Sequence, residues 1–201
     1  MKGRKHITRF TIVMVLAVLA VGVFAGAALA EDNIGEFELT GGELGMSALT
    51  LADFADATLL SSGAATTEAD SSTYSVTDAR GTGAGWEVWM SATQFTAPAV
   101  QGVSAERTLT EGIMKLQPFA AGDITVNFGS ATKPSIVNAT EQAVDNGALQ
   151  VLDAAASDLA MDGQGMGKYT MPAAHFHVAV PAGAYATTYS STLTISFTSG
   201  P

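Results

Sequence analysis

The sequence contains no cysteine, although its first residues have the features of an export signal. Disulfide cross-links are therefore excluded, and the exported chain must be stabilised by an ordinary hydrophobic core. The missing cysteine also excludes a lipobox, and no LPxTG-type sorting motif closes the sequence. We therefore expect no covalent anchoring to a lipid or to the cell wall by these two routes.

Basic residues are scarce, with 9 Lys+Arg against 19 Asp+Glu. Four of the nine (Lys2, Arg4, Lys5 and Arg9) precede residue 31, so residues 31–201 carry a net charge of 5 − 19 = −14. Such a chain repels nucleic acid and anionic lipid, which excludes both as direct partners. A neutral glycan remains compatible, as does an anionic wall polymer bridged by divalent cations.

A long apolar run occurs only at Thr11 to Ala30, behind the cationic front. It ends in the A-x-A pattern of Ala28 to Ala30, which predicts signal-peptide cleavage before Glu31. An uncleaved membrane anchor is the alternative, because about 20 apolar residues can span a bilayer. We expect a helical signal peptide at residues 1–30. Residues 31–201 should form one domain, not inserted in a membrane after cleavage.

Apolar and polar residues alternate through residues 31–201, which predicts strands with one buried face. In the last strand Leu193, Ile195 and Phe197 share one face with Tyr189, and hydroxyl residues form the other. Other predicted strands are 37–40, 74–78, 85–93, 123–128 with Ile124, Val126 and Phe128 inward, 149–152, and 175–180 with His175 and His177 outward. Gly- and Pro-containing turns separate them, which predicts an all-β antiparallel β-sandwich. A helix in 141–160 is the weaker interpretation, because Asn146-Gly147 interrupts it.

The strand predicted at 85–93 separates the two tryptophans, because its side chains point alternately to opposite faces. Trp86 is expected in the core, where a large apolar ring contributes most. Trp89 is expected on the solvent face beside Glu87, as a platform on which a sugar ring can stack. The alternative is that a loop or a second layer covers Trp89.

The segment before this strand, Arg80 to Gly85, reads RGTGAG. A dinucleotide fingerprint would need a strand before it and a helix after it, so we reject that interpretation. The glycines allow a tight connection between strands instead. Asp78 and Arg80 lie two positions apart, and they form either an ion pair that holds this turn or a contact with a ligand.

Candidate catalytic and metal sites are few. His175 and His177 would share one strand face and could supply half of a metal site. No further acidic or histidine ligand is visible near them in sequence, so we expect a solvated pair, no metal and no cofactor. No G-x-S-x-G elbow is present. We therefore expect no enzyme; a glycan-acting or metal-dependent activity would need a convergent His/acid cluster in the fold.

Two segments resemble the motif blocks of the WxL-domain surface proteins of Gram-positive bacteria. The first block, V-T-D-x-R-G…G-W-x-L-x-x-S-x-x-F-T, is matched by Val76 to Gly81, Gly85 to Val88, Ser91, and Phe95-Thr96. The second, Y-x-x-T-L-T-W-x-L-x-x-x-P, is matched by Tyr189 to Phe197 and Pro201. Shorter similarities lie at Gly41 to Leu44 and at Val180 to Gly183.

The chain departs from this pattern within both motifs. Val88 replaces the leucine of the first motif, while Ile195 and Phe197 replace the tryptophan and leucine of the second. The resemblance implies noncovalent association with peptidoglycan or the cell wall, at the cell surface and without catalysis. The residues that we predict to contact a ligand are Trp86, Glu87, Trp89, Asp78 and Arg80. The alternative function is a non-catalytic structural or adhesin-like subunit that assembles with other surface proteins.

Overall fold

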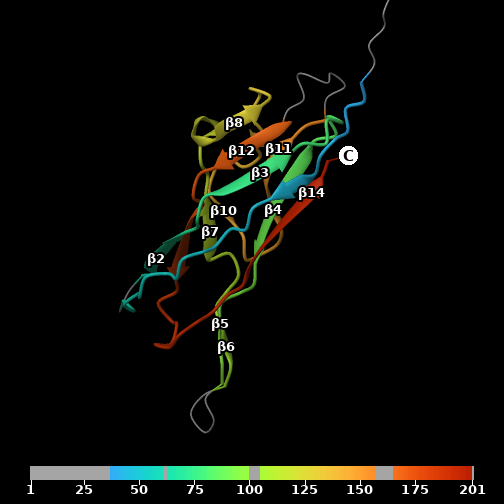
Figure 1. Ribbon diagram of the computed structural model, residues 1–201. Helices are drawn as coiled ribbons and strands as arrows, with labels where there is room; N and C mark the ends of the chain where they lie inside the picture. Colours follow the sequence, from blue (N-terminus) through green and yellow to red (C-terminus); the bar gives the residue numbers. More distant parts are fainter. Residues whose placement is uncertain (1–36, 61–62, 100–104, 157–164, 201) are drawn as a thin grey trace, which may run out of the picture. The chain divides into compact units, whose positions relative to one another are not determined.

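A computed structural model describes residues 37–60, 63–99, 105–156 and 165–200 of the chain (Figure 1). Contacts divide the chain into Met1–Leu39 and a compact unit, Thr40–Pro201. The predicted signal peptide at residues 1–30 lies outside the described residues. Among the residues that are described, no helix is long and apolar enough to cross a membrane.

Among the described residues of the compact unit, strands make up the regular structure, apart from one short 3-10 turn, η1 (Ala121–Asp123). The strands are β1 (Leu44–Met46), β2 (Ala65–Asp70), β3 (Tyr74–Asp78), β4 (Trp86–Ala92), β5 (Thr96–Ala97), β6 (Arg107–Thr108), β7 (Met114–Gln117), β8 (Thr125–Gly129), β9 (Ser135–Ile136), β10 (Gln142–Ala143), β11 (Leu149–Ala154), β12 (Gly167–Met171), β13 (His175–Val180) and β14 (Leu193–Ser199). Their pairings are antiparallel. The predicted all-β antiparallel sandwich is therefore confirmed.

Three four-stranded sheets have the orders β1-β3-β12-β8, β10-β7-β13-β2 and β14-β4-β11-β9, and β5 pairs with β6 (Figure 1). The first two sheets continue into each other, because β2 and β3 pair with β13 and β12 in a single register. At the junction the Ser71 amide donates to the Ala174 carbonyl oxygen (2.9 Å). The Ala174 amide in turn donates to Ser71 Oγ (2.8 Å). The β14-β4-β11-β9 sheet forms the other layer.

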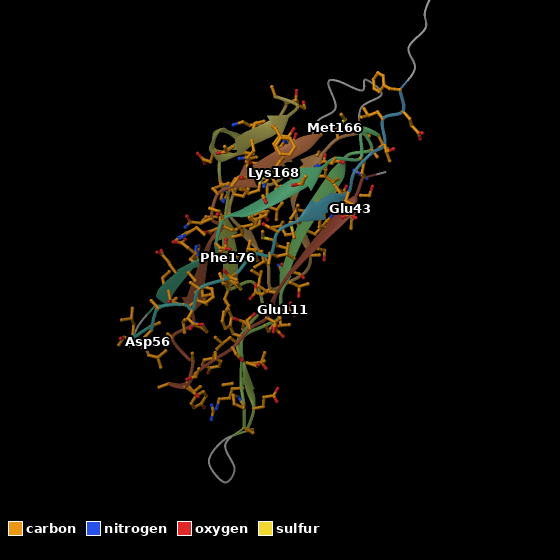
Figure 2. The ribbon with its side chains drawn as sticks, viewed as in Figure 1. Glu43, Asp56, Glu111, Met166, Lys168 and Phe176 are labelled. Atoms are coloured by element: carbon orange, nitrogen blue, oxygen red, sulfur yellow. The ribbon has the colours of Figure 1, made fainter. Side chains whose placement is uncertain are left out.

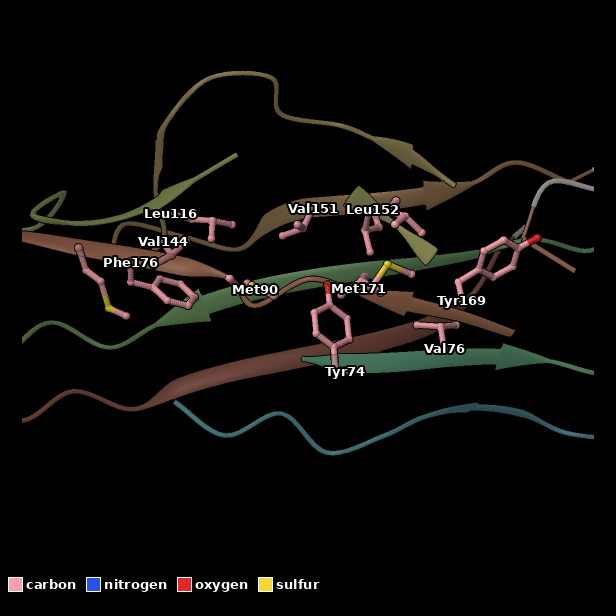
Figure 3. Packing of buried hydrophobic residues seen from close by; sticks show 14 of the residues in the cluster. Tyr74, Val76, Met90, Leu116, Val144, Val151, Leu152, Tyr169, Met171 and Phe176 are labelled. Atoms are coloured by element: carbon pink, nitrogen blue, oxygen red, sulfur yellow. The ribbon is translucent and has the colours of Figure 1, made fainter. Parts of the chain in front are cut away.

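The core lies between these layers, and Figure 3 shows its side chains converging from both. Five of these side chains have no exposed surface: those of Trp86, Val88 and Met90 in β4, Leu152 in β11 and Phe176 in β13. The alternation predicted for 74–78, 175–180 and the last strand matches β3, β13 and β14. The strand predicted at 149–152 corresponds to β11, whose register with β4 shifts between Gln150 and Leu152. Phe176 of β13 and Lys168 of β12 are labelled in Figure 2.

Two strand predictions are wrong in detail. Residues 37–40 form no strand, and the first pairing strand is β1. Phe128 was predicted to point inward, but 58% of its surface is exposed. Lys168 pairs with Phe128 while the next residue, Tyr169, pairs with Val126, so one extra residue is inserted in β8. Such a bulge interrupts the alternation of faces, and this accounts for the exposure of Phe128.

Two core tyrosines, Tyr74 and Tyr169, which are both labelled in Figure 3, differ in how their hydroxyl groups are hydrogen-bonded. The Tyr74 hydroxyl is buried with no hydrogen-bond partner among the described residues. The Tyr169 hydroxyl lies 2.9 Å from the Ser130 carbonyl oxygen and 3.0 Å from that of Met166. Burial raises the pKa of both tyrosines. An unpaired buried hydroxyl costs stability, whereas a paired one contributes to it.

We therefore expect that, of the two Tyr→Phe replacements, only Tyr169→Phe lowers the stability. Tyr74→Phe should leave the free energy of unfolding equal or raise it by up to roughly 1–3 kcal/mol, because an unpaired polar group is removed. Tyr169→Phe should lower it by about 0.5–1.5 kcal/mol. Urea unfolding followed by circular dichroism measures both. A clear loss of stability in Tyr74→Phe would contradict this account of its environment.

Candidate binding face

Strand β4 separates its side chains between the core and the outer face of the β14-β4-β11-β9 sheet. Trp86 and Val88 are fully buried, whereas Glu87, Trp89 and Ser91 are half-buried on the opposite face. The predicted separation of the two tryptophans is confirmed. It follows from the strand geometry, since an odd spacing along a strand places two side chains on opposite faces.

Trp89 is held in place on the outer face by Glu87. The indole Nε1 donates to Oε2 of Glu87 at 2.9 Å, which fixes the orientation of the ring. Across the neighbouring strands Trp89 pairs with Ser196 of β14 and Gln150 of β11. The ring is half-buried, so part of it stays accessible between a hydroxyl and an amide side chain.

The surroundings of Trp89 are rich in hydroxyl groups, and the described strands of this sheet, β14, β4, β11 and β9, contain no lysine or arginine. Thr194, Ser196 and Thr198 of β14 are exposed on this face. The two charged side chains that the paired strands place on this face are both acidic. They are Glu87 of β4 and Asp153 of β11, which pair directly with each other. Opposed like charges disfavour an anionic ligand here. An oriented indole between hydroxyl groups instead suits a neutral, polyhydroxylated ligand.

Trp86, the other predicted contact tryptophan, has no exposed surface. Its Nε1 donates to the Gly165 carbonyl oxygen at 3.0 Å. Its ring packs against Tyr169 and Phe197, with centroids 6.4 Å and 5.9 Å away. Because the indole is enclosed and its polar atom is satisfied, the structure places Trp86 in the core and leaves it no surface for a ligand.

Arg80 and Asp78 form an ion pair, the first of the two arrangements considered for this turn. Arg80 donates from Nε to Asp78 Oδ1 at 3.0 Å and from Nη2 to Oδ2 at 2.9 Å. It also donates to the Gly85 carbonyl oxygen and to Ser199 Oγ, both at 2.6 Å. The hydrogen bond with Asp78 is the main cause that raises the pKa of Arg80. One guanidinium thus connects the ends of β3 and β14 with the residue before β4.

This connection needs glycine at position 85. Gly85 has a φ of +72°, and a Cβ there would lie 2.1 Å from the Ala154 carbonyl oxygen. The side chain of Asp78 is 1% exposed and that of Arg80 is 19% exposed. Their polar atoms are directed at one another and at the backbone, so we interpret the pair as holding the turn.

His175 and His177 point outward, as predicted, but each lies beside a carboxylate that sequence reasoning missed. His175 Nδ1 is 2.5 Å from Asp70 Oδ1, and His177 Nδ1 is 2.7 Å from Glu141 Oε1. Asp70 belongs to β2, which pairs with β13, and the two residues are separated by 105 positions in the sequence. Only the strand register could reveal these partners. Among the described residues, no three His, Asp or Glu side chains converge as metal ligands.

A small cleft lies where β7 and β11 approach each other, lined by Leu116, Phe119, Ile136, Leu149 and Val151 among others. Its volume of about 10 Å³ is that of roughly one water molecule, too small for a sugar ring. The outer face around Trp89 is therefore the better candidate for a ligand of that size.

The described structure is thus an antiparallel β-sandwich with an oriented, partly accessible tryptophan on an open sheet face. A family model described as "WxL domain surface cell wall-binding" matches residues 42–201. The chain belongs to this family, and it is a cell-wall-associated surface protein. No match was found among curated proteins or among solved structures.

The structure also shows where the chain departs from the family pattern noted above. Ile195 and Phe197, which replace Trp and Leu of the second motif, lie on the inner face of β14. Phe197 pairs with Val88 and packs on the ring of Trp86. The missing second tryptophan therefore concerns the core side of the sheet, and the outer indole of Trp89 is unaffected by it.

Proposed function

We propose that this protein attaches noncovalently to the glycan of peptidoglycan through the outer face of the β14-β4-β11-β9 sheet. The observation that carries the proposal is the indole of Trp89, which is fixed by Glu87 and flanked by hydroxyl groups on a sheet whose described strands contain no lysine or arginine. The ring would stack on a sugar, and Ser196, Gln150 and Glu87 would exchange hydrogen bonds with its hydroxyls.

In this proposal, residues 1–30 are a signal peptide that directs export and is cleaved before Glu31. The exported protein has no catalytic activity. Its role is to bind. Neither nucleic acid nor an anionic membrane would be a partner, because residues 31–201 carry a net charge of −14. Binding of a neutral glycan should also be insensitive to salt, because no surface ion pairs need to be screened.

Trp89→Ala is expected to weaken retention of the exported protein on purified cell walls. An aromatic contact of about 0.5–1.5 kcal/mol corresponds to a loss of up to about tenfold in affinity. Phe128→Ala is the matched control, because Phe128 is an exposed aromatic on β8, in the other layer. Co-sedimentation at low salt, at high salt and with a chelator measures the retention.

Each outcome of this experiment bears on the proposal. Retention that is unchanged in Trp89→Ala would remove Trp89 from the binding face. No retention of the unsubstituted protein would exclude direct wall binding. Retention that disappears with the chelator would instead indicate an anionic wall polymer bridged by divalent cations.

A further inference from the structure

Strand β14 is an open sheet edge of a kind that folded proteins normally avoid. It runs for seven residues in unbroken register with β4, and no described strand pairs with its other side. It contains no proline, lysine or other charged residue. An unprotected edge of this length exposes a row of unpaired backbone groups that favours pairing with another strand.

The other edges of the described sheets are short, bulged or covered. Strands β1, β9 and β10 have three, two and two residues, and β8 carries the bulge at Asn127. The edge of β2 is covered by the preceding segment, where the Ala52 amide donates to the Asp70 carbonyl oxygen (3.0 Å). Strand β14 is therefore the one long and straight open edge in the part of the chain that the structure describes.

The hydrogen bonds to β4 show which backbone groups of β14 remain available. The Thr93 amide donates to the Thr192 carbonyl oxygen, and the Gly200 amide donates to the Gly85 carbonyl oxygen, both at 3.0 Å. In an antiparallel pair, residues alternate between facing the partner strand and facing away from it. The even-numbered residues of β14 therefore face β4. The amide and carbonyl groups of Leu193, Ile195, Phe197 and Ser199 point to the open edge.

We propose that β14 pairs in antiparallel fashion with β14 of a second copy of this chain, about a twofold axis at Ser196. The sequence Thr194-Ile195-Ser196-Phe197-Thr198 is chemically symmetric about its centre. The axis places Thr194 opposite Thr198, Ile195 opposite Phe197, and Ser196 opposite itself. This register also uses the outward-facing groups, because the hydrogen-bonded pairs then fall on the odd-numbered residues.

Burial and charge both favour a second copy as the occupant. Leu193, Ile195 and Phe197 are only half-buried on the inner face, and an identical row beside them would cover their remaining apolar surface. The strand is neutral although the chain is strongly acidic, so two copies can meet here without opposing charges. Glu87, the acidic residue of the adjacent strand β4, pairs with Thr198 and not with the axis residue, so it would be about 20 Å from its equivalent, beyond the screening length of about 8–10 Å.

The dimer would join two four-stranded sheets into one continuous sheet of 4 + 4 = 8 strands. Trp89 pairs with Ser196, so the two indoles would lie in line across the twofold axis, about 14 Å apart on one face. If the proposed glycan binding is correct, this arrangement gives a bivalent site with increased avidity. Only this consequence depends on the proposed function, whereas the dimer itself does not.

Ser196→Lys and Ser196→Glu test the proposal, because each places two like charges opposite each other at the axis. Either variant alone should raise the dimer dissociation constant at least about tenfold. An equimolar mixture of the two should restore a dimer, because the charges are then opposite. Sedimentation velocity of the exported protein over a range of concentrations measures this without any cell wall present, so its result is separate from that of the wall-binding experiment.

Thr66→Lys and Thr66→Glu are the matched controls, because Thr66 is an exposed residue on the covered strand β2. They should leave the dimer unchanged. Amide hydrogen exchange provides a second measurement, in which Ile195 and Phe197 should become protected as concentration rises. The proposal is overturned if the unsubstituted protein stays monomeric, if both Ser196 variants dimerise unmixed, or if these two amides exchange equally at all concentrations.

Discussion

Arg80→Ala is expected to lower the free energy of unfolding by about 3–5 kcal/mol, the range for removing one partner of a buried ion pair. The side chain of Asp78 is 1% exposed. In the variant it would keep only the hydrogen bond from the backbone amide of residue 80, which is 3.1 Å long in the unsubstituted protein. The links to Gly85 and Ser199 would also be lost. Thermal and urea unfolding measure the effect.

A double-mutant cycle separates the ion pair from the other contacts of Arg80. Asp78→Asn combined with Arg80→Ala should cost less than the sum of the two single changes, with a coupling energy of about 0.5–3 kcal/mol. Arg80→Lys is the conservative control, because an ammonium group cannot reproduce the two parallel bonds to a carboxylate. Full stability in Arg80→Lys, or simple additivity, would contradict the role assigned to the pair.

Trp86→Ala is expected to destabilise the fold by about 3–5 kcal/mol, through the cavity left by a fully buried indole. The loss of its hydrogen bond to Gly165 adds to the cost, because that carbonyl oxygen loses its partner. Trp89→Ala on the same strand should cost about 1 kcal/mol or less, because Trp89 lies on the outer face. Far-UV circular dichroism should follow unfolding, since each variant lacks one of the two fluorescent indoles.

The two tryptophan variants should therefore differ in kind. Trp86→Ala weakens the fold, whereas Trp89→Ala weakens wall retention with the melting temperature almost unchanged. Trp86→Phe is the milder variant, and it keeps the experiment informative if Trp86→Ala does not fold. Equal losses of stability in Trp86→Ala and Trp89→Ala would show that the two faces of β4 are not as different as the structure indicates.

Several features of the fold could be predicted from local pattern. The alternation in β4, β13 and β14 depends only on side-chain direction along a strand, so it was readable without knowing the strand order. The separation of Trp86 from Trp89 follows from the same geometry. Alternation does not show whether a segment finds a pairing strand, which is why residues 37–40 were predicted wrongly. It also does not show where a bulge interrupts the pattern, which is why Phe128 was placed on the wrong face.

The candidate site could be predicted only in part. The Asp78–Arg80 pair is local, and so is the contact of Glu87 with Trp89 two residues away. The bond from Arg80 to Ser199 spans 119 positions in the chain, and that between His175 and Asp70 spans 105. Such partners depend on strand register, which no local pattern records.

The amino-acid order by itself determined that this is an all-β chain of acidic character, without disulfides, with one tryptophan directed to each side of a strand. Those properties depend on composition and on the two-residue period of an extended backbone. Only the tertiary structure decided that the last strand is an open edge, that Arg80 connects three strands, and that Trp89 faces a row of hydroxyl groups. These features arise when strands distant in the chain pair with each other, because pairing selects both neighbours and register.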